Sequence, residues 1–222
     1  MPLGNSKKRQ SLDTGWIDIS VPLKNGMARW PTDPAIIITK IDSIKNGDVD
    51  NLTHVSMCAH TGTHMDAPSH FIKSGKTIDK MPVSATVGEA RVIEIKDKEF
   101  ITVEEIRPYR IRKREIILFK TGNSKTRWDN KPFKKKFVHL STEAAQYLAS
   151  RQVKTIGVDY LSIGGYDGNV VEVHNIILKA GIWVIEGLDL SKIKPGDYEL
   201  NCLPIKLTGA DGAPCRALIR KF

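Results

Sequence analysis

The sequence predicts a mixed α/β fold, rich in strands, that forms one compact domain. The chain has 222 residues, a length that supports one substantial hydrophobic core and favours one domain over two. Short β-rich runs alternate with segments of helical periodicity, and neither an internal repeat nor a low-complexity linker divides them. We therefore expect a domain over residues 16–222, preceded by a polar N-terminal tail over residues 1–15 that a partner subunit could order in part. No apolar run follows the basic residues of this tail, so we do not interpret it as a secretory signal.

The expected strands are short runs rich in β-branched and apolar residues, bounded by turn-forming residues. The Pro-rich loop Trp30–Pro34 separates the first two of them. The expected strands cover residues 16–23, 35–41, 52–59, 91–95, 115–121, 155–160, 182–185, 198–207 and 215–221.

Three segments carry helix signals. Residues 102–105, Thr-Val-Glu-Glu, have the form of a capping box and predict a short helix that ends before Pro108. Ser141 is suited to cap a helix over residues 141–150. Apolar residues at helical spacing predict a third helix over residues 169–180, with Gly181 directly after its end.

The net charge of +9 raises the question of nucleic-acid binding. The basic residues concentrate at 110–114 and 131–136, and such runs can neutralise phosphates. Solvated loops are the more common explanation, and no nucleic-acid motif accompanies the runs. We expect no nucleic-acid partner, although basic charge could steer an anionic substrate. The segment 125–136 keeps no assigned role.

The sequence also argues against a membrane protein and against a disulfide-rich one. No apolar run approaches the roughly 20 residues of a membrane span, so we expect no membrane partner. The cysteines are Cys58, Cys202 and Cys215, an odd number without CxxC spacing. A disulfide framework is therefore not expected, and a reducing cytoplasm is the default location.

The most informative segment runs from His60 to His70. It contains His60, His64, Asp66 and His70, all at even positions, and neutral imidazole with carboxylate suits Zn²⁺ or Mn²⁺. A straight strand would separate residues 60 and 64 by roughly 13 Å, too far for two imidazoles to share one ion. We therefore expect the strand to break or bulge at Gly62. The alternative is a polar surface turn with incidental histidines.

Pro68 and Cys58 lie close to these candidate ligands in the sequence. Pro68 should turn the chain so that His70 faces the ions without binding them. Cys58 could offer a thiolate ligand, but a small buried side chain beside the site is the preferred interpretation.

Two distant residues are further candidates. His174 lies on the expected third helix, and Glu186 follows an apolar strand at its carboxyl end, where α/β proteins often place reactive groups. Taken alone, each has an ordinary alternative, as a histidine on a helix surface and a charge at a strand end. His54 and His139 are best interpreted as ordinary histidines, although His54 could support the site from outside the ligand set.

Several of these motifs together resemble a known family. The segment His60–Phe71 is similar to the signature of the metal-dependent cyclase/hydrolase family that includes bacterial kynurenine formamidases and isatin hydrolases. Further matches occur in order from about residue 16 to the C-terminus: Trp30-Pro31 with Asp33, 157–162, His174, 186–188, 203–204 and 209–212.

The resemblance implies a fold, an assembly and a set of site residues. The family fold is a compact swivelling β/β/α domain, usually assembled as a homodimer or homotetramer. The implied ligands are His60, His64 and Asp66 for a first ion, with Asp66 bridging to a second ion held by His174 and Glu186. His70 matches the acid/base histidine. Trp30 matches the aromatic residue that lines the substrate pocket. One or two Zn²⁺ ions per subunit are expected, and Mn²⁺ is an alternative because isatin hydrolases of this family use one manganese.

These implications lead to a functional hypothesis. We expect a metal-dependent amidohydrolase that cleaves a small-molecule amide, most simply an aryl formamide such as N-formylkynurenine. Metal-activated water would attack, with His70 moving the proton. The first alternative is an isatin-hydrolase-like enzyme that opens a cyclic amide at the same site. The second is a non-catalytic metal-binding protein, which has no need for His70.

Overall fold

The described part of the chain, residues 15–126 and 128–222 of a computed structural model, contains twelve strands and three α-helices. Apart from residue 15, the expected polar tail lies outside the described residues. The strands are β1 (Ile17–Asp18), β2 (Ile37–Asp42), β3 (Leu52–Ser56), β4 (His64–Asp66), β5 (Val87–Glu94), β6 (Phe100–Ile101), β7 (Ile116–Lys120), β8 (His139–Leu140), β9 (Thr155–Val158), β10 (Trp183–Glu186), β11 (Gly196–Pro204) and β12 (Gly212–Arg220). The helices are α1 (Val103–Ile106), α2 (Thr142–Ser150) and α3 (Val170–Lys179).

Eight strands form one sheet that closes on itself. Their order is β1-β12-β11-β5-β7-β9-β10-β4, and β4 also pairs with β12. β5, β7, β9 and β10 run parallel, whereas β4 is antiparallel to both of its neighbours. The short strand β4 therefore completes the ring, and its three residues are all buried.

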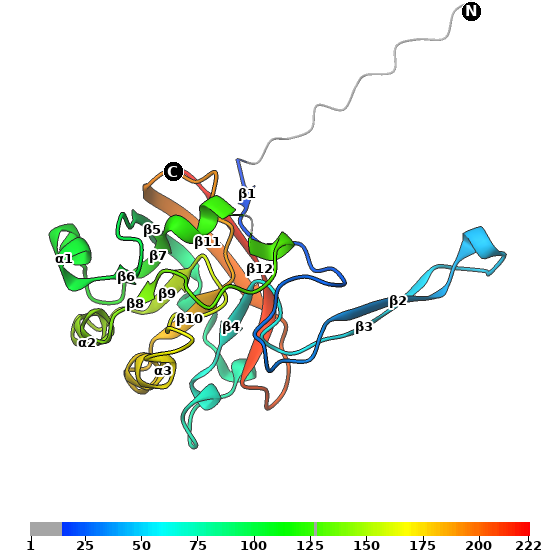
Figure 1. Cartoon of the computed structure of the whole chain (residues 1–222), viewed down its shortest axis with the longest axis horizontal. Helices are drawn as coiled ribbons and strands as arrows, with labels where there is room; N and C mark the ends of the chain where they lie inside the picture. The colour runs from blue at the N-terminus through cyan, green and yellow to red at the C-terminus, as the bar shows by residue number, and fades with distance from the viewer. Residues whose placement is uncertain (1–14, 127) are drawn as a thin grey trace, which may run out of the picture.

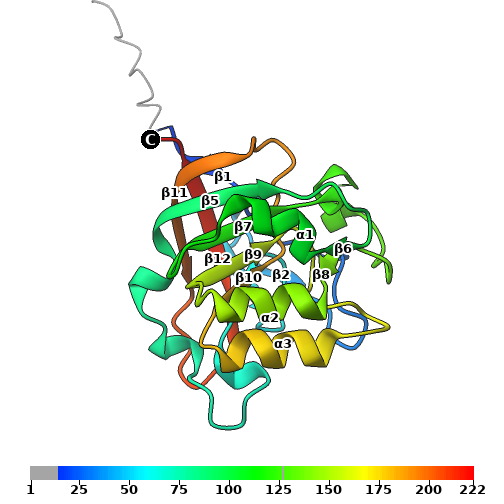
Figure 2. The same ribbon diagram turned by 90° about the vertical axis from the view of Figure 1, so that its left-hand side faces the viewer.

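The helices cover one face of the parallel strands, as Figures 1 and 2 show for α2 and α3. β7, β9 and β10 are buried on both faces, which explains their nearly continuous apolar sequences. One core lies between the helices and the sheet and includes Phe119, Leu148 and Ile177. A second core, with Met65 and Leu200, lies within the ring of strands. The strand-rich α/β fold is the one predicted.

The helix signals were accurate. The Thr102 hydroxyl accepts a hydrogen bond from the Glu105 backbone N–H, and the Ser141 hydroxyl accepts one from that of Ala144. Gly181 has φ +74° at the end of α3. Within the described residues, no helix is long and apolar enough to cross a membrane.

The first expected strand is much shorter than predicted, because its hydrogen bonds change partner. β1 covers only Ile17–Asp18, and Ser20 forms an isolated bridge with Leu188. The Val21 backbone N–H then donates to the Thr63 hydroxyl at 2.8 Å. The chain after β1 is thus fastened to the segment that precedes β4, which carries the histidines.

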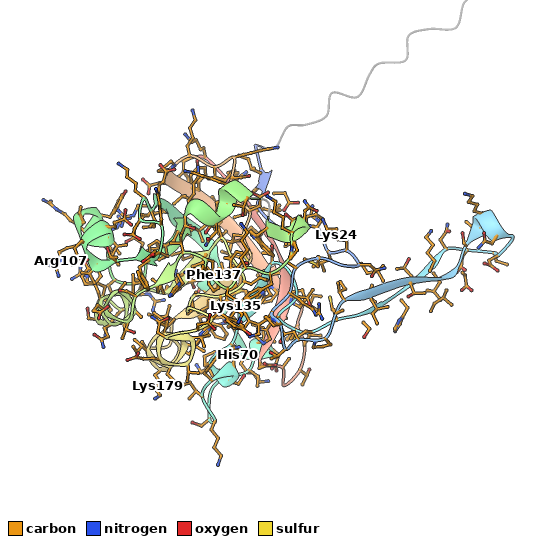
Figure 3. The ribbon with its side chains drawn as sticks, in the orientation of Figure 1. Lys24, His70, Arg107, Lys135, Phe137 and Lys179 are labelled. Carbon is orange, nitrogen blue, oxygen red and sulfur yellow. The ribbon has the colours of Figure 1, made fainter. Side chains whose placement is uncertain are left out.

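Strands β2 and β3 form a separate two-stranded hairpin that projects from the body of the molecule (Figure 1). Figure 3 shows its side chains extending into solvent along most of its length. Apolar residues on this arm are exposed: Ile37, Ile41, Ile44, Val49, Leu52 and Val55. We call residues 37–56 the hairpin arm.

Candidate metal centre and active site

The segment from His60 to His70 folds as a turn, a short strand and a second turn. Gly62 has φ +68°, a left-handed conformation open to glycine, and β4 begins directly after Thr63. The predicted break at Gly62 is confirmed. Pro68 begins a 3₁₀ turn over Pro68–His70, so the chain turns after β4 as expected.

Strand pairing brings the distant residues to β4. His64 and Asp66 lie two residues apart on β4 and therefore share one face. Glu186 is the register partner of His64 on β10, and Gly212 is the partner of Asp66 on β12. His174 reaches the same place from α3, where its side chain is 3% exposed. The structure thus gathers the predicted ligands, from three separate parts of the chain, around one point.

The first group contains His60, His64 and Asp66. The Asp66 Oδ1 lies 2.8 Å from His60 Nδ1 and 3.5 Å from His64 Nε2. Two atoms bound to one tetrahedral zinc ion at about 2.0–2.1 Å lie about 3.3–3.4 Å apart. The separation between the His64 nitrogen and the Asp66 oxygen therefore suits a shared cation, while it is too long for a good hydrogen bond.

The second group uses the other oxygen of Asp66. His174 Nε2 lies 3.6 Å from Asp66 Oδ2 and 3.4 Å from Glu186 Oε1. Both His64 Nε2 and Asp66 Oδ2 are fully buried without a hydrogen-bond partner. Because buried polar atoms are costly when unpaired, these two orphaned atoms are best explained as metal ligands. The residues present thus fit two divalent ions that share Asp66.

Hydrogen bonds on the opposite side of each imidazole fix the ring. His64 Nδ1 donates to the Gly62 carbonyl at 3.0 Å, and His174 Nδ1 donates to the Val170 carbonyl at 2.6 Å. Each of these histidines therefore presents an unprotonated Nε2 to the centre when neutral. His60 is reversed, since its Nδ1 faces Asp66 while its Nε2 lies 2.9 Å from Asp211 Oδ2. Such outer contacts are typical of metal-binding histidines.

In the metal-free protein, the positive charges of the imidazoles and the negative charges of the carboxylates in the cluster compensate one another. Burial lowers the pKa of His60, His64 and His174, but the adjacent carboxylates, which favour the charged imidazolium, outweigh burial and raise each pKa to about 10. Burial raises the pKa of Asp66 and Glu186, but the adjacent imidazoles bring both below their ordinary values. A divalent cation would therefore take the place of protons on the imidazoles.

His70 stands beside this cluster without joining either group that shares Asp66. Its ring stacks on His60 with centroids 4.0 Å apart, and its Nδ1 lies 3.2 Å from Asp211 Oδ2. Burial lowers the pKa of His70, with the carboxylate of Asp66 opposing this effect. The imidazole is therefore neutral at neutral pH and able to accept a proton.

A cavity of about 260 Å³ opens onto the cluster. Trp30 lines it together with Phe71, Leu161 and the ligand histidines. Behind Trp30 stand Phe133 and Tyr166, with ring centroids 5.3 and 5.1 Å from that of Trp30. Trp30 therefore lies at the cavity, and the substrate-contacting role that the resemblance implies for it stays a prediction.

The basic segment 125–136 contributes to this aromatic wall. Phe133 belongs to it, and the Lys135 ammonium lies 5.0 Å from the centroid of the Tyr166 ring. Figure 3 marks Lys135 together with His70. At least this part of the segment is therefore packed against the residues that support Trp30.

Sequence reasoning did not assign a role to Asp211. Its carboxylate contacts both His60 and His70, and the only signal for it was its place in the segment 209–212 that resembles a family motif. The remaining candidates are not brought to the centre: His54 is exposed on the hairpin arm, and His139 donates to the Phe137 carbonyl. Cys58 is half-buried and belongs to none of the metal-type clusters among the described residues.

Comparison with known sequences places this arrangement among relatives. A family model described as Putative cyclase matches residues 17–164. The kynurenine formamidase of Bacillus cytotoxicus is 38% identical over 209 residues, which cover 92% of this chain and 97% of that protein. The kynurenine formamidase of Bacillus cereus is 36% identical over 205 residues, with the same coverage.

Solved structures share the fold. A predicted metal-dependent hydrolase from Bacillus stearothermophilus matches with a TM-score of 0.80 at 31% identity, covering 92% of this chain and 97% of that one. Isatin hydrolase A from Labrenzia aggregata matches with a TM-score of 0.81 at 24% identity over 93% of each chain, which is a likeness of fold alone.

Proposed function

This chain belongs to the cyclase family, and we propose that it hydrolyses an aryl formamide such as N-formylkynurenine. The family relationship makes it a metal-dependent hydrolase of carbon–nitrogen bonds other than peptide bonds. The observation that carries the proposal is Asp66, whose two carboxylate oxygens face two adjoining ligand groups beneath an aromatic-lined cavity.

We infer that the ligands are His60, His64 and Asp66 for one ion, and Asp66, His174 and Glu186 for a second. A divalent ion held by these residues would lower the pKa of a water molecule toward neutrality and would polarise the substrate carbonyl. The histidine-rich donor set and tetrahedral separations support Zn²⁺ as the native metal, with Mn²⁺ as the alternative.

His70 moves the proton in this proposal. With Nδ1 held by Asp211, its Nε2 is left for proton transfer in the cavity. The neutral imidazole accepts a proton from the attacking water and returns it to the leaving nitrogen, so that formate and an arylamine are released. Trp30 supports the aromatic ring of the substrate through its flat face.

Turnover by the metal-loaded protein tests this function. We expect N-formylkynurenine to be hydrolysed, and His70→Ala to lower kcat by about 10²–10⁴-fold, the usual contribution of a general acid–base, with metal content unchanged. His139→Ala is the matched control, because that histidine lies outside the centre. Loss of metal from the His70 variant would make His70 a ligand. Hydrolysis of isatin in place of the formamide would favour the cyclic-amide alternative.

We further propose that the protein is a homodimer or homotetramer whose subunits cover the hairpin arm. An isolated two-stranded hairpin is only marginally stable in water, and this one exposes apolar side chains along its length. A second copy of the chain is the occupant we infer. Light scattering should give a molar mass that is a multiple of the 24.8 kDa chain mass, and Ile41→Lys should reduce the measured mass. Val83→Lys changes a similarly exposed residue on the body of the molecule and should leave the measured mass unchanged.

The cytoplasm is the location we propose. Cys58, Cys202 and Cys215 are all free thiols, although the sulfur atoms of Cys202 and Cys215 lie 3.4 Å apart. This agrees with a reducing compartment. Titration of three thiols in protein purified from its native source, without added reductant, would support this location.

A further inference from the structure

Asp211 makes contacts that link the two parts of the proposed site. One of its oxygens, Oδ2, lies 2.9 Å from His60 Nε2 and 3.2 Å from His70 Nδ1. The two imidazole rings are stacked with an interplanar angle of 27°, so both present a nitrogen to the same carboxylate. A proposed metal ligand and the proposed acid/base thus share one acceptor atom.

The chain around Asp211 is built to hold it there. The Asp211 carbonyl accepts a hydrogen bond from the Ala67 backbone N–H at 2.8 Å, directly after Asp66. Gly212, the next residue, lies against the His60 ring, and a Cβ at this position would be 2.7 Å from His60 Cε1. Only glycine leaves room for the ring. Backbone pairing and a close approach therefore set His60 and Asp211 in one arrangement.

The chemistry of the two nitrogens determines what this contact does. When His60 uses Nδ1 toward a cation, its Nε2 carries the proton and donates to Asp211. When His70 uses Nε2 for proton transfer, its Nδ1 carries the proton and donates to the same oxygen. The carboxylate accepts both donors with its negative charge, whereas the oxygen of an asparagine side chain could accept them only as a neutral, weaker acceptor.

We infer that Asp211 is a positioning residue that acts through His60 on the first metal and through His70 on the proton. It fixes the tautomer and the orientation of both rings. Because both rings donate to one oxygen, it also links the position of His60, the metal ligand, to that of His70, the acid/base. This inference rests on the proposed function. Asp211 itself needs no contact with substrate.

The test compares Asp211→Asn with Asp197→Asn, a carboxylate on an exposed part of β11 that serves as the control. Zn²⁺ affinity is measured first, by competition with a chromogenic chelator. We expect Asp211→Asn to weaken the first of two sites by about 10–100-fold, the usual effect of removing such an outer partner, and to spare the other. Asp197→Asn should change neither.

A double-mutant cycle then separates a role through His70 from a general structural effect. With Zn²⁺ saturating in every variant, so that only the role through His70 differs, Asp211→Asn should lower kcat at least tenfold in the wild-type background and less than threefold in the His70→Ala background. Equal factors in both backgrounds, or an unchanged Zn²⁺ affinity, would overturn the inference. If the wild type fails to hydrolyse any formamide, the proposed function is wrong. The Zn²⁺ affinities would still test whether Asp211 positions His60. Asp211→Ser provides the same comparison if the asparagine variant does not fold.

Discussion

Gly187→Ala is the substitution whose effect follows most directly from the structure. Gly187 follows Glu186 with φ +73°, and a Cβ there would overlap the carbonyl oxygen of Gly62. The left-handed conformation costs a residue with a side chain roughly 1–2 kcal/mol, and forcing backbone apart in a packed site costs about 1–3 kcal/mol more. We therefore expect the free energy of unfolding to fall by about 2–5 kcal/mol.

Gly181→Ala is the matched control, because Gly181 has φ +74° but no atom within 4 Å of its Cβ position. It should cost only the roughly 1–2 kcal/mol of backbone strain. Urea denaturation of the metal-free proteins measures both. Gly187→Ala should also weaken Zn²⁺ binding, since the Gly62–Gly187 contact holds His64 opposite Glu186. Equal losses of stability in the two variants would refute the idea that this close approach sets the spacing of the ligands.

Two further predictions concern metal and pH. Zn²⁺ at 100 times its dissociation constant should stabilise the folded protein by about 2.7 kcal/mol per site, so chelation of both ions should lower the Tm of the wild type by about 10–20 °C. In Glu186→Gln the decrease should be about half as large, because this variant should lose one of the two sites. The glutamine keeps an acceptor for the Ile163 N–H. Differential scanning fluorimetry checks this, and an equal shift in both proteins would contradict it. Because His60, His64 and His174 have pKa values raised to about 10 in the metal-free protein, Zn²⁺ must displace protons, and affinity should rise from pH 6 to pH 9. By the same shifts, the stabilisation of the metal-free fold is complete below about pH 6.5 and is lost as the pH rises through about 10, so the urea midpoint should fall over this range. A flat affinity profile would count against charged imidazoles in the metal-free cluster.

Periodicity and capping residues were sufficient to predict most of the helices and strands. Ser141 and Thr102 act through bonds to neighbours within a few residues, and such local rules can be read from sequence. The strand expected over residues 16–23 failed for the opposite reason. Its end at Asp18 depends on Thr63, a residue far along the chain that takes the Val21 N–H away from the sheet.

The site shows the same division between local and distant information. The cluster at residues 60–70 was visible because its residues are close in sequence, and the break at Gly62 followed from the reach of an extended strand. His174 and Glu186 could be raised above ordinary alternatives only through the family resemblance, because the pairing of β4 with β10 brings Glu186 to the cluster and His174 reaches it from α3. Asp211 was missed since a half-exposed aspartate in a turn carries no periodic or spacing signal.

The proposed metal centre depends most on Asp66, which would contribute to the binding of both divalent cations. Elemental analysis of protein reconstituted with Zn²⁺ and freed of excess metal tests this claim most directly. We predict two ions per chain in the wild type and a loss from both positions in Asp66→Ala. A wild-type protein that never holds more than one ion, or an Asp66→Ala variant that keeps two, would contradict it.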